Sequence, residues 1–279
     1  MPHRHATYEA LAADDEVDAI YVSTPHPFHK DNSILCLTSG KAVLCEKPFA
    51  LTTDEVDQMI AAKNASGLAL AEAFMYRHHP QTKLATQWIK DGHLGDVSFV
   101  RAVHTYKMML RDGNIRLTPE FGGGSFWDVG VYPLSFVQLI MGGAPERVSA
   151  EQFVTDTGVD EVFTGQLYYA EGKLAQLSSS FINPSHTLAE VFGTEGRLSL
   201  NRPFVRMDAD RQMFFHAADG SSKEIEVPDK PLYLGEVEDM HAAILDGTPN
   251  FLTLEESRNH VRTTVALYEA ARTGKIVTL

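Results

Sequence analysis

The first 76 residues alternate short apolar runs with segments that carry one apolar face, the pattern of consecutive β-α-β units. The predicted strands cover residues 19–23, 42–45 and 68–71, and the predicted helices cover 8–13, 29–38 and 53–66. Gly40 and Gly67 stand where two of these helices should end. Crossover connections of this kind join parallel strands, so we expect a Rossmann-like parallel sheet.

Beyond residue 76 the pattern changes to longer runs in which apolar and polar residues alternate. These runs predict strands over 98–104, 146–153, 162–169, 175–181, 188–192 and 197–200, with helices over 81–90, 236–245 and 254–272. Turn signals such as Glu171-Gly172 separate the strands. We therefore predict an α/β chain of two domains: an incomplete Rossmann-like parallel sheet in residues 1–76, followed in residues 77–279 by an α+β domain with a large, mostly antiparallel open sheet.

Composition narrows the classes of partner. The 279 residues are 44% hydrophobic and 22% charged, and the formal net charge is −13. This acidic surplus disfavours nucleic acids and anionic membranes as partners, because both are bound through Lys and Arg. No apolar run is long enough to span a membrane, and the first residues lack the pattern of a signal peptide. Cys36 and Cys45 lie in apolar surroundings, as buried free thiols do, so we expect a cytoplasmic protein.

Residues Glu46-Lys47-Pro48 directly follow the second predicted strand. Ligands of open α/β sheets bind beyond the carboxyl ends of parallel strands, so Lys47 stands where a ligand is expected. Pro48 restricts the turn and can follow a cis peptide bond, so the turn can direct the lysine to one place. The alternative is a solvated lysine on a surface turn, and this motif alone does not decide between the two.

A second motif joins Gly122-Gly123-Gly124 to Asp128 and Tyr132. Glycines before a helix let the backbone approach a ligand closely, and a helix N-terminus favours anionic groups. Asp128 and Tyr132 are four residues apart, so on a helix they share a face and could enter one cleft. The alternative is a capping aspartate beside a core tyrosine.

A third motif, Thr24-Pro25-His26-Pro27-Phe28-His29, follows Ser23 at the carboxyl end of the first strand, where a cofactor would bind. His26 and His29 are close enough in sequence for a metal site to be considered, with His78-His79 as further donors. Pro27 lies between the two histidines, so they should not share a helical face, and we predict no metal site. His29 could also be an exposed residue that starts a helix.

The segment Met75-Tyr76-Arg77 lies at the junction of the two predicted domains. Clefts between domains are common ligand sites, so this segment is a candidate for one wall of a pocket. Arg77 could bind a phosphate or a hydroxyl group there. An ion pair between the domains explains Arg77 equally well.

Together these motifs resemble the oxidoreductase family typified by glucose-fructose oxidoreductase and inositol dehydrogenase, over nearly the whole chain. The resemblance rests on Thr24-Pro25 with His29, Glu46-Lys47-Pro48, Gly122-Gly123-Gly124 with Asp128 and Gly130, and Gly193-Thr194-Glu195-Gly196. Many members have a histidine where this chain has Tyr132. The tyrosine, together with residues 73–77, is similar to the branch of dimeric dihydrodiol dehydrogenase, NADP-dependent xylose dehydrogenase and glucose-fructose oxidoreductase.

The resemblance implies an enzyme that transfers a hydride between a nicotinamide cofactor and the carbinol or carbonyl carbon of a sugar, a dihydrodiol or a similar hydroxy compound. It makes Tyr132 the general acid or base, with Lys47 polarising the substrate oxygen and favouring the phenolate, and Asp128 orienting Lys47 or a substrate hydroxyl. It places Met75 and Tyr76 at the substrate pocket. The residues implied for cofactor binding are Ser23, Thr24, Pro25, His26, His29, Glu46, Lys47, Pro48 and Arg77.

The resemblance also implies partners. The cofactor would be NADP or NAD, with NADP favoured by the branch alone. Members of the family pair through the open face of the second domain's sheet, so we expect a homodimer.

The chain departs from the family in one respect. The family begins with a strand, a Gly-x-Gly-x-x-Gly loop, a helix and a second strand, and no Gly-x-Gly-x-x-Gly occurs in the 279 residues. That loop supplies backbone N–H groups to the pyrophosphate, and the second strand carries the residue that selects NAD or NADP. We therefore expect an N-terminally truncated dinucleotide-binding domain, impaired cofactor binding and an open apolar edge on the first strand. The alternative function is a non-catalytic binding module that dimerises through its sheet.

Overall fold

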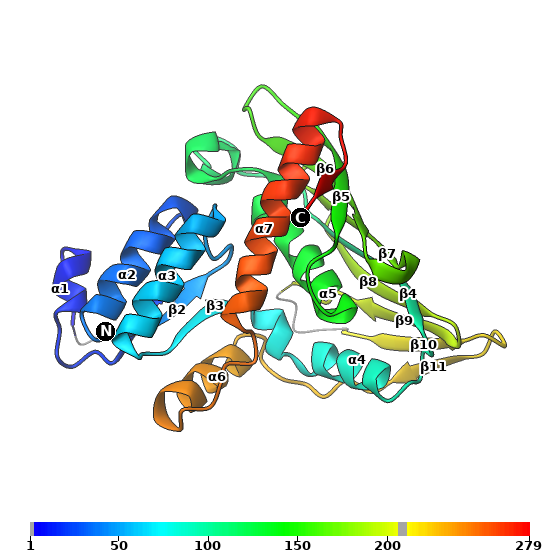
Figure 1. Ribbon diagram of the computed structural model, residues 1–279, viewed down its shortest axis with the longest axis horizontal. Helices are drawn as coiled ribbons and strands as arrows, with labels where there is room; N and C mark the ends of the chain where they lie inside the picture. Colours follow the sequence, from blue (N-terminus) through cyan, green and yellow to red (C-terminus); the bar gives the residue numbers. More distant parts are fainter. Residues whose placement is uncertain (1–2, 206–210) are drawn as a thin grey trace.

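The computed structural model describes residues 3–205 and 211–279 (Figure 1). Its first elements are α1 (Tyr8–Ala12), β1 (Ala19–Val22), η1 (His26–Phe28), α2 (His29–Thr38), β2 (Ala42–Glu46), α3 (Thr53–Ser66) and β3 (Leu70–Ala73). The three strands form a parallel sheet in the order β1-β2-β3, so β1 lies at an edge and pairs with β2 alone in the described part of the chain. The Rossmann-like parallel sheet is therefore confirmed.

The boundaries of these elements follow from local sequence. Thr52 and Glu55 form a capping box at the start of α3, and Gly67 ends that helix with a φ of 71°. Strand β3 begins two residues later than predicted, because Leu68 still donates its N–H to the Ser66 hydroxyl in the turn that leaves the helix. The order of helices and strands matches the sequence pattern throughout this part.

The second part is built on a nine-stranded sheet in the order β11-β10-β9-β8-β4-β7-β6-β5-β12. Strands β4 and β7 are parallel, and the other neighbours are antiparallel, as predicted for a mostly antiparallel sheet. The short strands β10, β11 and β12 were not predicted. The bounds are β4 (Val97–Thr105), β5 (Arg147–Val154), β6 (Asp160–Tyr168), β7 (Leu174–Ser180), β8 (His186–Gly193), β9 (Gly196–Asn201), β10 (Met213–Ala217), β11 (Ser222–Ile225) and β12 (Val277–Thr278).

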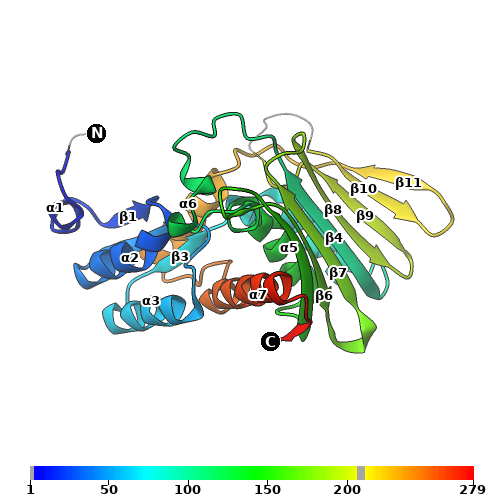
Figure 2. The ribbon, with the colours of Figure 1, turned by 90° about the horizontal axis from the view of Figure 1, so that it is seen from above.

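Helices lie on one face of this sheet and leave its other face open, as Figure 2 shows. They are α4 (Pro80–Lys90), α5 (Val131–Met141) and α7 (Leu254–Thr273). A π-helical segment, η5 (Phe126–Gly130), leads directly into α5. The remaining short segments are η2 (Met75–His78), η3 (Ile115–Leu117), η4 (Pro119–Phe121) and η6 (Ala170–Gly172).

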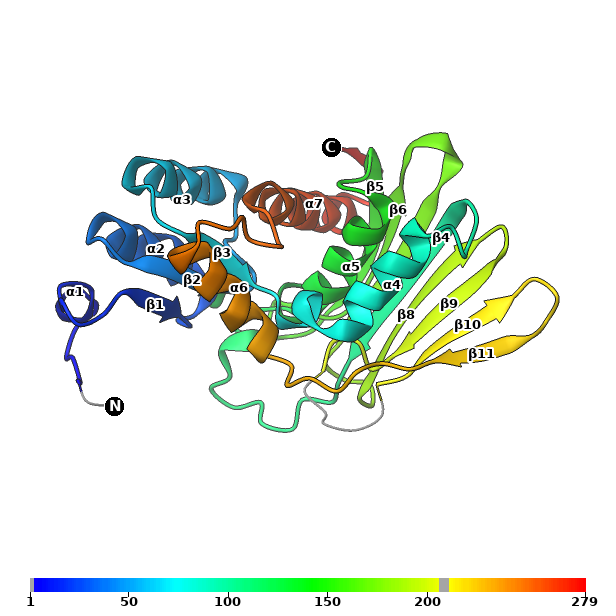
Figure 3. The same ribbon diagram turned by 90° about the horizontal axis from the view of Figure 1, so that it is seen from below.

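Two late helices return to the parallel sheet (Figure 3). Met240 of α6 (Leu234–Leu245) packs with Ala42 and Ala71 on one face of the sheet. Val261 of α7 belongs to the apolar cluster on the opposite face, which includes Val43. Residues late in the chain thus complete the core of the first domain, and the division into residues 1–76 and 77–279 stays a prediction. No helix in the described ranges is both long and apolar enough to cross a membrane.

Candidate active site

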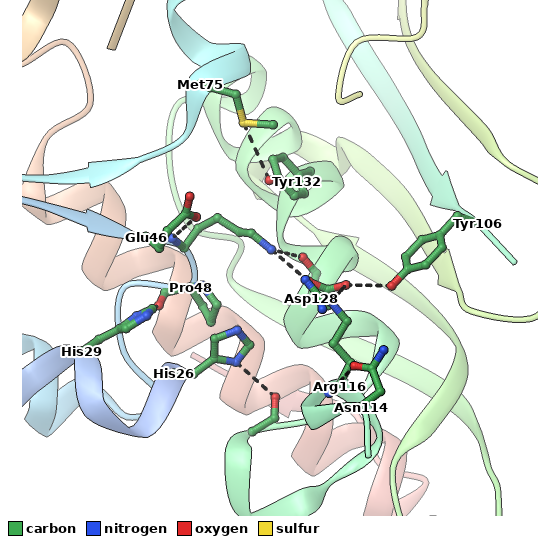
Figure 4. A network of polar contacts seen from close by, with 12 residues as sticks. His26, His29, Glu46, Pro48, Met75, Tyr106, Asn114, Arg116, Asp128 and Tyr132 are labelled. Atoms are coloured by element: carbon green, nitrogen blue, oxygen red, sulfur yellow. Dashed lines mark hydrogen bonds and ion pairs between the residues drawn. The ribbon is translucent and has the colours of Figure 1, made fainter. Parts of the chain in front are cut away.

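A cavity of about 990 Å³ lies where the carboxyl ends of β1 and β2 face the large sheet. Most of the residues predicted to bind a ligand line it. Figure 4 shows His26, His29, Glu46, Asp128 and Tyr132 among them. These residues are Ser23, Thr24, Pro25, His26, His29, Glu46, Lys47, Asp128 and Tyr132. The position matches the rule that ligands of α/β sheets bind beyond the carboxyl ends of parallel strands.

Lys47 leaves the end of β2 and reaches across to η5. Its Nζ donates to the backbone carbonyl of Asp128 and lies 3.2 Å from Oδ1 of the same residue. The Lys47–Pro48 peptide bond is cis. The side chain is only 10% exposed, so the structure disagrees with the alternative of a solvated lysine on a turn.

Asp128 is the centre of the polar network in Figure 4. Besides Lys47, its carboxylate accepts hydrogen bonds from Arg116 Nε at 2.8 Å and from the Tyr106 hydroxyl at 3.1 Å. Burial raises the pKa of Asp128, but Lys47 and Arg116 outweigh it and lower the pKa to about 2. The carboxylate is therefore charged at neutral pH and holds both cations beside the cavity.

The π-helical turn requires Gly130. A Cβ atom at this position would lie 2.1 Å from Cδ2 of Phe126, so a larger residue would displace the buried ring. This contact explains the glycine two residues after Asp128 in the motif. The same turn brings Asp128 and Tyr132 to the cavity, as their spacing predicted.

Tyr132 presents its ring to Lys47, with Nζ 5.0 Å from the ring centroid. Its hydroxyl donates to Met75 Sδ at 3.7 Å, a long contact with a weak acceptor. Burial, with Glu46 and Asp128 nearby, raises the pKa of Tyr132 well above its ordinary value. The expectation that Lys47 favours the phenolate thus differs from the structure: desolvation outweighs the cation, and the phenol keeps its proton at neutral pH.

His29 joins the loops that follow β1 and β2 at one side of the cavity. Its Nδ1 lies 2.8 Å from the Pro48 carbonyl oxygen and its Nε2 lies 2.8 Å from the Thr24 carbonyl oxygen. The residue is fully buried, in contrast to the alternative of an exposed residue that starts a helix. His26 lies 3.2 Å from the Gly122 carbonyl oxygen. Burial and the neighbouring Lys47 lower the pKa of His26 to about 3, so this ring is neutral.

A second acidic residue, Glu236, lies close enough to Glu46 to be affected by its charge. Glu46 accepts a hydrogen bond from the Tyr21 hydroxyl, and Glu236 in the first turn of α6 is 4% exposed. Burial and the negative charge of Glu46 raise the pKa of Glu236 to about 8. The Oε2 atom of Glu236 has no hydrogen-bond partner in the described part of the chain.

Glu236→Gln is expected to reduce a pH-dependent loss of stability. Folded Glu236 keeps its proton up to about pH 8, whereas a glutamate in the unfolded chain ionises near pH ~4.3. Between these values the unfolded state binds fewer protons, so the free energy of unfolding falls as the pH rises. Urea unfolding at about pH 5 and about pH 9 should show this decline in the wild type and a smaller one in the variant.

Glu238→Gln is the matched control, because Glu238 lies on the same helix, is 53% exposed and pairs with Lys230. It should keep the decline of the wild type. Equal declines in the wild type and in Glu236→Gln would contradict the assignment.

Arg77, Tyr76, Met75 and Pro48 do not line the cavity. Arg77 is 1% exposed and donates to Glu256 Oε1 at 2.7 Å and to the Ser135 hydroxyl at 3.3 Å. The structure therefore favours the ion-pair interpretation of Arg77 over a role in binding the cofactor. Tyr76 is fully buried and donates to Ser135, while Met75 contributes only its sulfur, beneath the Tyr132 hydroxyl.

Arg77→Met is expected to lower the free energy of unfolding by about 2 kcal/mol, because it removes the charged hydrogen bonds that the 1% exposed guanidinium donates to Glu256 and Ser135. Urea unfolding followed by circular dichroism measures the change. Arg258→Met serves as the control, since Arg258 forms an exposed pair with Asp57, and it should lose less than about 1 kcal/mol. Similar losses in both variants would show that the Arg77 pair has no special weight.

The comparison with known proteins decides the family. Residues 3–74 match the family described as "Oxidoreductase family, NAD-binding Rossmann fold", and residues 82–199 match the "GFO/IDH/MocA C-terminal domain". D-xylose 1-dehydrogenase (NADP(+)) 2 of Haloferax volcanii is 35% identical over 280 residues, which are 100% of this chain and 86% of that protein. The chain belongs to the GFO/IDH/MocA oxidoreductase family. This confirms the resemblance found in the sequence.

Two further relatives of the GFO/IDH/MocA chain differ in activity. Trans-1,2-dihydrobenzene-1,2-diol dehydrogenase of Xenopus tropicalis is 35% identical over 204 residues, covering 72% of this chain and 60% of that protein. A crystal structure of aldose-aldose oxidoreductase from Caulobacter crescentus, complexed with glycerol, superposes with a TM-score of 0.90 at 25% identity and covers 98% of this chain and 82% of that chain.

A 3-ketoreductase from Actinomadura kijaniata, in complex with NADP and TDP-benzene, superposes with a TM-score of 0.87 at 27% identity over 95% of this chain and 81% of that chain. In the present chain, Thr24, Pro25 and Lys47 line the cavity at the ends of β1 and β2, and they fit the nicotinamide end of such a cofactor. The sequence contains no Gly-x-Gly-x-x-Gly loop for the phosphates.

The cavity residues that sequence patterns did not identify include the polar side chains His104, Tyr106, Arg116 and Tyr233. Each belongs to a strand, a loop or a short segment without its own motif, and only the alternation of β4 could have placed His104 on the inner face. In the described ranges, one group of three possible metal ligands lies together, formed by His3, His5 and Asp14 outside the cavity.

Proposed function

We propose that this chain binds NADP(H) and interconverts a CH–OH group and a carbonyl group of a sugar, a dihydrodiol or a related polyhydroxy compound. The observation that carries the proposal is the position of Lys47, Asp128 and Tyr132 in one cavity beside the carboxyl ends of the parallel strands. The activities named for the similar proteins support it: they act on D-xylose, on a dihydrodiol and on aldoses.

The three side chains have distinct tasks. A bound nicotinamide cofactor accepts or supplies the hydride. In reduction the neutral phenol of Tyr132 donates its proton to the substrate oxygen, and in oxidation the same oxygen atom takes the proton back. The Lys47 ammonium group polarises the substrate oxygen and stabilises negative charge that develops on it. Asp128 holds Lys47 in place, and Arg116 and Tyr106 hold Asp128.

We propose that Ser23, Thr24, Pro25, His26, His29 and Glu46 bind the nicotinamide and ribose side of the cofactor. The contacts of His29 with both loops support this role, because they fix the shape of that wall. NADP is preferred over NAD in this proposal. The names of the xylose dehydrogenase and of the 3-ketoreductase complex support NADP.

NADP reduction in the presence of D-xylose tests the activity, and reduction that depends on both compounds supports it. Backbone N–H groups of a glycine-rich loop normally bind the pyrophosphate, and this chain contains no Gly-x-Gly-x-x-Gly loop. We therefore expect weak cofactor binding by this chain. Titration followed by NADPH fluorescence should give a Kd above about 100 μM, corresponding to roughly 5 kcal/mol of binding free energy. Tight, saturable binding would contradict the expectation of impaired affinity.

We also propose that the chain forms a homodimer through the open face of its nine-stranded sheet. This face carries Phe153, which is 57% exposed, and the ring pair Phe99 and Phe192 with centroids 5.2 Å apart. Sedimentation equilibrium should show a dimer for the wild type and a monomer for Phe192→Asp, and a monomeric wild type would contradict the proposal. A dimer without any turnover would favour the alternative of a non-catalytic module.

We propose a cytoplasmic location for the protein. The buried free cysteines Cys36 and Cys45 support it.

A further inference from the structure

His104 is a buried cavity residue that the mechanism does not use. It lies on β4, is 6% exposed and lines the cavity beside Tyr132, with the two ring centroids 5.4 Å apart. It also stacks on Phe204, with ring centroids 5.9 Å apart and an interplanar angle of 24°, and Phe204 in turn lies 6.1 Å from the Tyr132 ring centroid. The imidazole is therefore part of a cluster of three mutually contacting rings, next to the tyrosine proposed to exchange the proton.

Neither nitrogen of His104 has a hydrogen-bond partner among the described residues. Nδ1 is fully buried, so Nε2 is the nitrogen that a ligand in the cavity can reach. The preceding inward positions on the same strand, Val100 and Ala102, are apolar. A ring nitrogen without a partner at the wall of the cavity, on a strand face that is otherwise apolar, points to a polar ligand that the described residues do not provide.

The charges around the ring define the chemistry of that ligand. Burial and the nearby Lys47, opposed by Asp128, lower the pKa of His104 to about 3, so the ring is neutral at physiological pH. A neutral imidazole has one N–H donor and one acceptor nitrogen. Whether Nε2 is the donor or the acceptor, it suits an uncharged hydroxyl group, which can accept or donate, better than a carboxylate or an ammonium group.

We propose that His104 hydrogen-bonds the hydroxyl group on the carbon next to the reacting carbon, so that the protein prefers vicinal diols over substrates that lack this second hydroxyl. The inference rests on the proposed dehydrogenase function. With the reacting oxygen held between Lys47 and Tyr132, the imidazole lies on the cavity wall beside Tyr132, where it can meet the hydroxyl group on the next carbon. His104 thus sets substrate preference and takes no part in proton transfer.

The test compares D-xylose with 2-deoxy-D-xylose, which differ by this one hydroxyl group. His104→Phe keeps an aromatic ring against Phe204 but has no ring nitrogen, and His104→Gln keeps a donor and an acceptor. Loss of one neutral hydrogen bond predicts that His104→Phe lowers kcat/KM for D-xylose about tenfold and changes the deoxy sugar less than about twofold. His104→Gln should recover part of the preference for D-xylose.

Two outcomes overturn different statements. Equal losses on both sugars in His104→Phe, or no preference in the wild type, would overturn the inference while leaving the dehydrogenase function intact. Absence of turnover in the wild type would overturn the proposed function instead. Calorimetric titration of both sugars into the wild type and His104→Phe then decides the inference: it requires a wild-type preference for D-xylose that the variant lacks, and equal affinities reject it.

Discussion

Lys47→Met is expected to lower turnover about a thousandfold, because removal of one preorganised group that stabilises a developing oxyanion costs that much in other sites. The ammonium group is the cation closest to Tyr132, 5.0 Å from its ring centroid, and it is held by Asp128. Methionine retains the length and apolar stem of the side chain but not the charge. Turnover of D-xylose with NADP, measured at the highest soluble cofactor concentration, gives the effect.

Lys41→Met is the matched control for this substitution. Lys41 is also buried, at 8% exposure, and its Nζ donates to the Asp14 carbonyl oxygen at 2.8 Å, outside the cavity. Its replacement should reduce stability and leave turnover within about threefold of the wild type. If Lys47→Met kept more than a tenth of the wild-type turnover, the proposed role of Lys47 would be wrong.

The fold could be predicted from the sequence where periodicity and turn residues agree. The helix at His29–Thr38 has the predicted bounds, and the long strands of the large sheet differ from prediction by two residues or fewer at each end. The strands at Met213–Ala217 and Ser222–Ile225 are too short, and too mixed in polarity, for an alternating pattern to appear. They are strands because β9 pairs with the first of them, a tertiary effect that local sequence does not contain.

The residues of the candidate site could be predicted only where they belong to a sequence motif. Lys47, Asp128 and Tyr132 belong to motifs with fixed spacing, and the structure brings all three to one cavity. Arg116 has no such motif: it reaches Asp128 from the loop after β4, and chain spacing gives no sign of this contact. Arg77 was a candidate for the cavity because it lies at the junction of the two parts, but its partner Glu256 comes from 179 residues later in the chain.

The same physics separates the two pKa expectations. A cation lowers the pKa of a nearby acid, and this holds for Asp128, which has Lys47 and Arg116 in direct hydrogen-bond contact. Lys47 contacts the ring of Tyr132, whereas the Tyr132 hydroxyl is buried, and desolvation of this hydroxyl raises its pKa. A sequence motif can suggest which charged residues lie near a titratable group. The direction of the pKa shift also depends on how deeply the group is buried and on which atoms are in contact.

Tyr132→Phe is expected to lower turnover by a factor of about 10³, within the range found for loss of a general acid or base. The substitution removes only the hydroxyl group, whose partner in the structure is Met75 Sδ at 3.7 Å. The ring contacts with Phe74 and Lys47 remain, so the protein should stay folded. Turnover in both directions, together with sugar binding, separates loss of proton transfer from loss of affinity: kcat should fall and the Kd for D-xylose should change little.

The pH profile of the wild type provides a second measure of the same group. Because the pKa of Tyr132 is raised, the phenol keeps its proton through neutral pH, and the rate of carbonyl reduction should be flat until the solution becomes strongly alkaline. Oxidation needs the unprotonated oxygen and should become faster as the pH rises. Tyr76→Phe is the control, since Tyr76 is a buried tyrosine outside the cavity that donates to Ser135, and it should preserve both profiles. Near-normal kcat in Tyr132→Phe, or the same pH dependence in both directions, would assign the proton transfer to another residue.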